Sequence, residues 1–285
     1  MTIILSLSQA NNTLWAAGPD GLYIVTGSGL QQVPQPQENL YCCCAIHDRI
    51  LVGGLPHGVA FSMQQGENWQ AGWIDSVDAP VITLAADPLV EQSGVILAGT
   101  DGGGVLRSTN RGNHWYARNF GLRSFNVLAL AWAPPAPAEA WPRWQTVFAC
   151  TEEGIYHSPN GGRGWKRVEC PEAVYQAIAV APDFHMSGVV LAGSESSGLF
   201  RSVDGGHSFS PVPEIAGQVN ALVATPTGWL LSDENQVWQS SDGQQWQPLA
   251  ESRSALTLLA AGDAVWAGHE DGVARVDAGA VPVAA

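Results

Sequence analysis

The sequence contains a single lysine, Lys166, and Lys and Arg together number 12 against 26 Asp and Glu, for a formal net charge of -14. Nucleic acids and anionic membranes attract proteins through cationic side chains that face their phosphates. A chain with this charge repels those phosphates, which argues against nonspecific binding to DNA, RNA or anionic lipid. The same charge favours solubility, or a partner that is itself basic.

Long apolar segments are also absent. No run approaches the roughly eighteen apolar residues of a membrane-spanning helix. The opening "MTIILSLSQ" lacks the basic residues of a signal peptide, and its apolar run is too short for one. We therefore expect a soluble cytoplasmic protein without membrane insertion.

The five cysteines are an odd number, and Cys42, Cys43 and Cys44 are adjacent whereas Cys150 and Cys170 lie far away. No CxxC spacing or paired histidine cluster provides zinc ligands, so the sequence predicts no metal site and no cofactor. The cysteines are typical of small buried hydrophobic residues in a reducing compartment.

One eight-residue segment, called the octet below, recurs along the chain. It reads "STNRGNHW" at 108–115, "SPNGGRGW" at 158–165 and "SVDGGHSF" at 202–209. Weaker copies are "SMQQGENW" at 62–69 and "SSDGQQW" at 240–246, where one residue is missing. The closing aromatic residues recur about every 44 residues, which indicates an internal repeat.

The residues around each octet predict four strands per repeat. Two β-rich runs joined by a polar turn precede the octet, an alternating segment lies further upstream, and a short segment follows. Two more hairpins, "TLWAAGPDGLYIVTGSG" and "AVWAGHEDGVARVDAG", lack an octet, and the final "AVPVAA" can supply a last strand. The predicted fold is all-β, a seven-bladed β-propeller of four-stranded antiparallel blades. The blades begin near residues 1, 39, 79, 125, 174, 218 and 253 of one domain, 1–285, with no helix.

The octet pattern Ser-x-Asp/Asn-x-Gly-x-x-Trp resembles the Asp-box, or BNR repeat, of sialidases, sortilin-type receptors, xyloglucanases and photosystem II assembly factors. The sequence pattern "RSxDGGxxW" most resembles the repeats of the assembly factors. In those families the box is a turn between the third and fourth strands, on the face opposite the usual binding face. A short polar side chain can hold such a turn through backbone N–H groups, and the aromatic ring can pack between sheets. The resemblance thus implies a structural role for Ser108, Asn110, Trp115, Ser158, Asn160, Trp165, Ser202, Asp204, Phe209, Asp242 and Trp246.

The loops between second and third strands surround the mouth of a propeller's channel, and in this chain they are rich in acidic residues. They contain Asp20, Asp101, Glu152, Glu153, Glu195, Asp233, Glu234, Glu270 and Asp271. The arginines are expected in octets or after third strands, as at Arg107, Arg201 and Arg275, and not around the mouth. An acidic mouth would attract an Arg- or Lys-rich partner, or a cation such as Ca²⁺. Alternatively, these acids are ordinary hairpin-turn residues beside glycine.

Aromatic residues in irregular segments suggest further contact surfaces. Trp73, Phe120 and Phe125 fall in predicted connections between blades, and Trp141 and Trp144 fall in a Pro-rich insertion at 133–145. Long loops that carry aromatic residues are often interaction sites, although these rings can equally pack over the blade edges.

The chain lacks the signatures of common enzymes, including a P-loop and a Ser-His-Asp arrangement. Resemblance to sialidases would imply an arginine triad beginning near the N-terminus, but the first arginine is Arg49. Resemblance to xyloglucanases would imply two propellers facing a cleft, and this chain supplies one. We expect a noncatalytic protein-binding scaffold or assembly-factor-like module whose partner is a protein with a basic surface. The alternative is a carbohydrate-binding lectin or glycoside hydrolase-like propeller, and the oligomeric state stays open.

Overall fold

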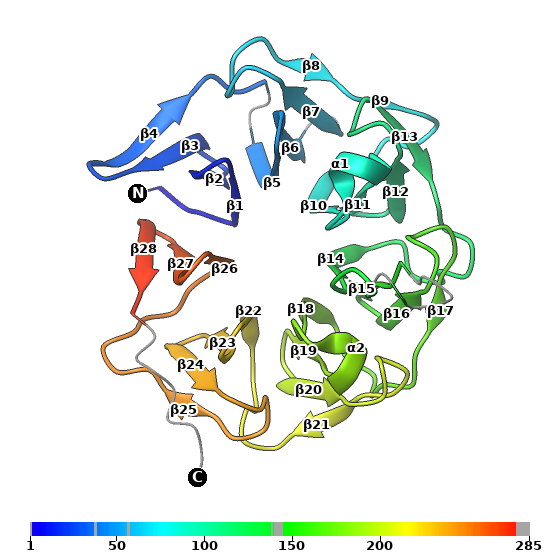
Figure 1. The fold of residues 1–285 in the computed structure, drawn as a ribbon, viewed down its shortest axis with the longest axis vertical. Coiled ribbons are helices and arrows are strands. Elements are labelled where there is room, and N and C mark those ends of the chain that lie inside the picture. The colour runs from blue at the N-terminus through cyan, green and yellow to red at the C-terminus, as the bar shows by residue number, and fades with distance from the viewer. Residues whose placement is uncertain (1, 37–38, 56–57, 138, 140–144, 278–285) are drawn as a thin grey trace.

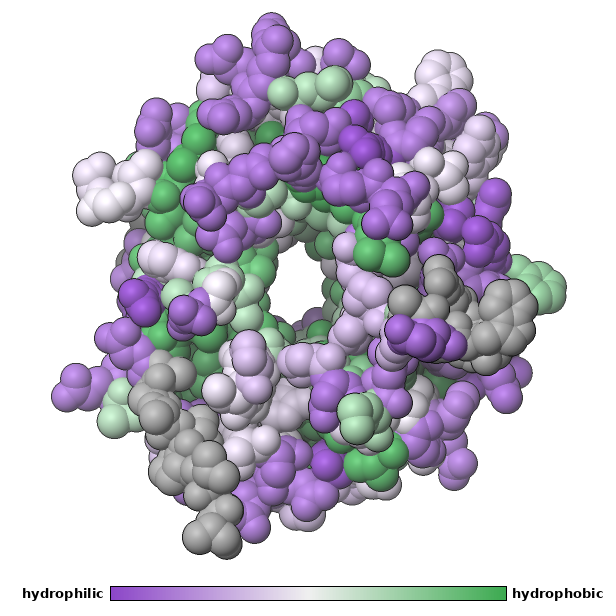
Figure 2. Space-filling view, in the orientation of Figure 1, coloured by the Kyte–Doolittle hydropathy of each residue, from purple (hydrophilic) through white to green (hydrophobic). Residues whose placement is uncertain are grey.

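The computed structural model describes residues 2–36, 39–55, 58–137, 139 and 145–277. Seven sheets are arranged as blades around a central channel (Figure 1). The prediction of an all-β, seven-bladed propeller with four-stranded antiparallel blades is confirmed. Figure 2 shows the open channel at the centre of the disc.

The strands follow one another outward from the channel in each blade. The first three blades contain β1 (Ser6–Ala10), β2 (Thr13–Gly18), β3 (Gly21–Thr26) and β4 (Gly29–Val33); β5 (Asn39–Ile46), β6 (Arg49–Leu55), β7 (Val59–Ser62) and β8 (Gln70–Ala71); and β10 (Val81–Ala86), β11 (Ile96–Thr100), β12 (Val105–Ser108) and β13 (His114–Ala117). The next two contain β14 (Val127–Trp132), β15 (Val147–Thr151), β16 (Gly154–Ser158) and β17 (Lys166–Arg167); and β18 (Tyr175–Val180), β19 (Val190–Ser194), β20 (Leu199–Ser202) and β21 (Ser210–Val212). The last two contain β22 (Val219–Thr225), β23 (Gly228–Asp233), β24 (Val237–Ser240) and β25 (Gln247–Pro248); and β26 (Thr257–Ala261), β27 (Ala264–His269) and β28 (Gly272–Val276). The fourth strand expected from "AVPVAA" lies outside the described residues.

The core is divided among the interfaces between neighbouring blades. Second strands are buried on both faces, as in β11 and β15, because each packs against a blade on either side. The cluster between the third and fourth blades, for example, joins Leu97 and Val105 to Val147 and Tyr156. Each blade therefore depends on its neighbours for burial, as in other repeat proteins.

The ring closes by packing of its first and last blades. The first blade is made of four consecutive strands, β1 to β4, and none of the described C-terminal strands is shared with it. Ile4 donates its backbone N–H to His269 O over 2.9 Å. Ile4 also joins an apolar cluster in which Leu259 and Trp266 of the last blade pack against the first.

Two short helices correct the expectation that no helix occurs. α1 (Val90–Ser93) and α2 (Phe184–Ser187) each lie between the first and second strands of a blade and end at a left-handed glycine. Both helices are a single turn, and a four-residue turn leaves too short an apolar period to be read from sequence. No helix among the described residues has the length and apolar character needed to cross a membrane.

The octets form the turns between third and fourth strands, held by one repeated set of hydrogen bonds. Gly162 donates its N–H to Ser158 Oγ over 3.0 Å, and Asn160 Oδ1 accepts the N–H groups of Arg163 and Gly164 at 3.0 and 3.1 Å. The octets at 108–115, 202–209 and 240–246 repeat the bond from glycine to serine. The glycine has a φ of +76° at Gly162, a conformation that a side chain would strain.

The aromatic residue of each octet fills the space between blades. Trp115 is fully buried, and Trp165, Phe209 and Trp246 are 5–7% exposed. Trp165 Nε1 also donates to Arg118 O of the preceding blade over 2.9 Å. In the weaker octet at 62–69, Ser62 still accepts the N–H groups of Gln64 and Gly66, although Gln64 replaces the acidic residue.

Candidate functional site

The acidic loops lie on the face opposite the octets. Strands alternate in direction, so loops joining second to third strands meet the connections between blades on one face, here called the mouth face. Asp101 illustrates this meeting, because its N–H donates to Pro80 O of the preceding connection over 3.0 Å. The octets and the two helices belong to the other face, here called the octet face.

Six of the nine predicted acidic residues carry carboxylates without a hydrogen bond or ion pair to any described residue. All six are exposed, and each comes from a different blade: Asp20, Asp101, Glu153, Glu195, Glu234 and Glu270. The second blade alone contributes none, because its loop "LPHG" contains no acid. The mouth face thus carries a nearly complete ring of carboxylates that form no ion pair within 4.0 Å with a described cation.

The other three acids are engaged within the protein. Asp233 Oδ1 accepts the N–H groups of Asn235 and Gln236 at 2.7 and 2.8 Å, and Oδ2 accepts Trp238 Nε1 at 2.7 Å. Asp233 is therefore a turn residue, in line with the alternative interpretation. Glu152 Oε2 accepts Asn126 Nδ2 at 2.7 Å.

Asp271 forms a two-pronged ion pair with Arg253, with both N–O distances at 2.7 Å. The hydrogen bond from Arg253 lowers the pKa of Asp271. This contact corrects the expectation that arginines avoid the mouth. Arg123 and Arg167 also lie at the mouth, contrary to that expectation. They line an open cavity of about 350 Å³ whose other lining residues include Glu152, Glu153 and Glu172.

The channel opens inside the carboxylate ring. The first strand of every blade lines it, and five of these strands carry a register irregularity at the same place, near the mouth face. The extra residue at each irregularity projects toward the channel: Tyr41, Ile82, Leu128, Gln176 and Asn220. The last two side chains already form hydrogen bonds within the protein, since Gln176 Nε2 donates to Val219 O and Asn220 Nδ2 donates to Asp233 O.

The predicted aromatic residues are exposed but scattered. Trp73 is 68% exposed, Phe120 85% and Phe125 46%. Phe120 and Phe125 lie in the connection between the third and fourth blades, whereas Trp141 and Trp144 lie outside the described residues. The structure does not gather these rings into one surface.

Trp73 lies in a strand that sequence reasoning missed. β9 (Trp73–Ile74) pairs in parallel with β13 of the next blade, Trp73 opposite His114. The Trp73 ring meets His114 edge-on at 6.2 Å, and His114 stacks on Tyr116 at 4.9 Å. Two residues are too few for a periodic signal, so no sequence pattern marks this pairing.

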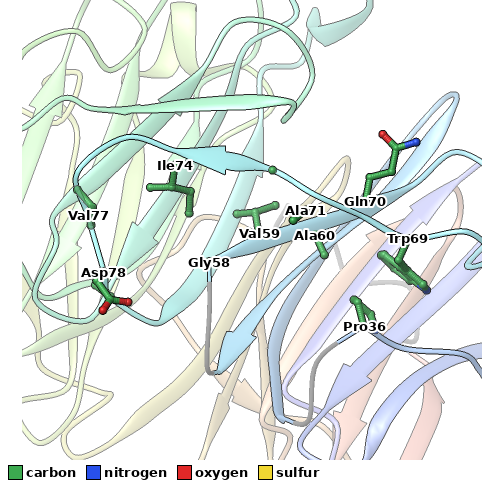
Figure 3. Close-up of a pocket in the computed structure, with 12 residues that line it drawn as sticks. Pro36, Gly58, Val59, Ala60, Trp69, Gln70, Ala71, Ile74, Val77 and Asp78 are labelled. Atoms are coloured by element: carbon green, nitrogen blue, oxygen red, sulfur yellow. The ribbon is translucent and has the colours of Figure 1, made fainter.

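A groove of about 370 Å³ lies beside the same segment (Figure 3). Val59 and Ala60 form its base, with Trp69 toward one end and Ile74 toward the other. Trp69 Nε1 donates to Pro34 O over 2.8 Å and so is not free to bind a ligand. Three separate segments build this groove, so no local sequence pattern could have revealed it.

The cysteines and carboxylates are candidate metal ligands and nucleophiles in the described part of the chain. No group of three His, Cys, Asp or Glu residues there could hold a metal ion. Burial raises the pKa of Cys43 to about 12 and that of Cys44 to about 11, although Ser6 opposes the shift at Cys43. These thiols stay protonated, which makes them poor nucleophiles.

Comparisons with solved structures show the same fold at low sequence identity. The extracellular domain of BT4673 from B. thetaiotaomicron superposes with a TM-score of 0.75 at 14% identity, covering 96% of this chain and 38% of that one. A GH74 xyloglucanase from Xanthomonas campestris gives 0.70 at 15% identity, covering 95% and 51%. YCF48 from Cyanidioschyzon merolae gives 0.70 at 12% identity, covering 95% and 94%. YCF48 bound to D1 peptide gives 0.71 at 15% identity, covering 95% and 92%.

The chain thus spans less than two fifths of the BT4673 domain and about half of the xyloglucanase. No family model matches the sequence, and no curated protein matches it either. These similarities show a propeller fold that is shared by a glycoside hydrolase and by a protein that binds a peptide.

Proposed function

We propose that this protein is a noncatalytic binding module whose mouth face engages a basic segment of another protein. The observation that carries the proposal is the ring of six exposed carboxylates from six blades, none paired with a described cation. Such a ring focuses negative potential at the channel entrance, where it speeds association with a cationic partner.

One comparison supports this role, because YCF48, a propeller of nearly the same extent, is seen with a bound peptide. We also propose that the octets are Asp-box turns that stabilise the opposite face. We place the protein in the cytoplasm because its five cysteines are free. The second candidate function is carbohydrate binding or hydrolysis, which the structural similarity to the xyloglucanase supports.

The test is binding of a fluorescent arginine-rich peptide at two salt concentrations. We expect a double variant, Glu153→Gln with Glu195→Gln, to weaken binding about three- to tenfold, chiefly through the association rate. The matched control is Glu67→Gln with Asp263→Asn, which removes the same charge from the octet face. Equal losses in both variants, or binding that ignores salt, would show that the mouth ring does not recognise the peptide.

A further inference from the structure

In two places a guanidinium group ties one blade to the octet of the next. Arg49 Nη1 donates to Arg111 O over 2.8 Å, and Arg107 Nε donates to Gly161 O over 2.7 Å. In both cases the acceptor is the fourth residue of the octet, which has a left-handed backbone with φ of +58° at Arg111 and +69° at Gly161. The fourth residue therefore presents its carbonyl group to the preceding blade.

The octet at 240–246 lacks this residue. Gly243 donates its N–H to Ser240 Oγ over 2.8 Å, so it takes the place of the fifth octet residue. Asp242 Oδ1 accepts the N–H groups of Gln244 and Gln245 at 2.8 and 2.9 Å, as the third octet residue does elsewhere. The single missing residue is thus the fourth, whose carbonyl would face the fifth blade.

Arg201 of the fifth blade has lost its acceptor as a result. It is the structural equivalent of Arg107, because Leu191 pairs with Arg201 as Leu97 pairs with Arg107. Arg201 forms no hydrogen bond or ion pair with any described residue, and its Nε is buried without a partner. An open cavity of about 490 Å³ lies at this point, lined by Arg201, Ser241 and Asp242.

Other polar groups with spare capacity line the same cavity. Trp229 is only 6% exposed, and its indole N–H has no acceptor among the described residues. Asp183 uses Oδ1 to accept Ser187 Oγ at 2.9 Å, which leaves Oδ2 available, and Asp242 likewise uses only Oδ1. No ion pair within 4.0 Å joins Arg201 to either carboxylate in the described residues, so opposite charges face each other across open space.

We propose that this cavity binds a small zwitterion, a molecule of the amino-acid or dipeptide kind with one carboxylate and one ammonium group. Arg201 and Trp229 can only donate hydrogen bonds, so they suit the carboxylate of the ligand. Asp183 and Asp242 can only accept when ionised, so they suit its ammonium group. A plain oxyanion is disfavoured because the cavity holds two carboxylates against one guanidinium, and a plain cation leaves Arg201 unpaired.

The size of the cavity agrees with this ligand class, since small-molecule sites span about 300–1,000 Å³. The site lies on the octet face and is independent of the proposed recognition of basic segments at the mouth. The sequence predicts Arg201 after a third strand and Asp242 in a structural turn. The structure places Arg201 within the third strand β20, and the residue missing between Asp242 and Gly243 gives both side chains a second role.

The test uses the dipeptide glycylleucine and two capped forms, N-acetylglycylleucine and glycylleucinamide, each lacking one charge. We expect thermal stabilisation by the uncapped dipeptide and at least tenfold weaker binding of both capped forms. Arg201→Gln should lose binding about ten- to a hundredfold with an unchanged Tm, because Arg201 has no partner to lose. Arg107→Gln is the matched control, and it should lower the Tm and leave binding unchanged.

A glycine inserted between Asp242 and Gly243 should restore the missing carbonyl, pair with Arg201, raise the Tm and abolish binding. Equal binding of capped and uncapped dipeptides, full binding by Arg201→Gln, or no stabilisation by any of the three compounds would overturn the proposal. If the insertion prevents folding, the comparison of Arg201→Gln with Arg107→Gln still decides the matter.

Discussion

Replacing Trp165 by alanine tests whether the octet aromatic residue holds neighbouring blades together. The side chain is 6% exposed and packs in the apolar cluster with Leu97, Val105 and Tyr156. Its removal leaves a cavity between the third and fourth blades and breaks the bond from Nε1 to Arg118 O. Losses of this kind cost about 3–5 kcal/mol when the surrounding structure cannot collapse.

The backbone contact at the same position stays, because Trp165 N still donates to Phe120 O at 2.9 Å. We therefore expect a folded variant whose Tm falls by about 6–10 °C, at roughly 2 °C per kcal/mol for a chain of this size. Far-UV circular dichroism during heating and urea titration measures the change. Trp73→Ala is the matched control, because Trp73 is 68% exposed and its loss should stay within about 0.5 kcal/mol. A loss below about 1 kcal/mol in Trp165→Ala would refute the inference that the ring is a structural wedge.

Two further predictions concern titratable groups. Burial, aided by the nearby charge of His207, lowers the pKa of His157 to about 4, below the roughly 6.5 of an unfolded chain. The folded protein then takes up the proton less readily, so stability present above about pH 6.5 declines by about 1–2 kcal/mol as the pH falls toward 4, after allowance for partial exposure. His157→Gln should flatten the dependence of Tm on pH in this window, and an unchanged dependence would assign it to other groups. A thiol reagent should label Cys170 alone in the folded protein and all five cysteines after denaturation, because the other four are buried; rapid labelling of a second thiol would contradict this.

The sequence predicts the blades well because the repeat carries the information locally. The serine, the Asp or Asn two positions later and the glycine of each octet interact within a few residues, as Ser202, Asp204 and Gly206 show. Such short-range bonds leave the same residues at the same spacing in the three complete copies at 108–115, 158–165 and 202–209. Burial also makes the second strands easy to predict, because a strand buried on both faces, such as β19, is a nearly continuous apolar run.

The functional surfaces were harder to predict because their contacts join distant residues. Arg253 and Asp271 stand in different loops, and nothing in either loop marks the ion pair that neutralises this part of the mouth. Asp233 lies in the same kind of loop as the other mouth acids, yet its carboxylate accepts hydrogen bonds from its own turn and from Trp238. Composition therefore finds the acidic face, and only geometry separates available carboxylates from structural ones.

The departures from the repeat are the most informative positions for function. In the complete octet at 158–165 the fourth carbonyl, Gly161 O, accepts a hydrogen bond from Nε of the facing Arg107, although Arg107 Nη2 is buried without a partner. Where that residue is missing, the same arginine stands unpaired at Arg201 and a cavity opens. A buried donor without an acceptor is costly, so the unpaired Nε of Arg201 opposite the shortened octet favours an acceptor that enters the cavity from outside the chain. A bound carboxylate would be such an acceptor, and for this reason we infer a ligand site at the shortened octet.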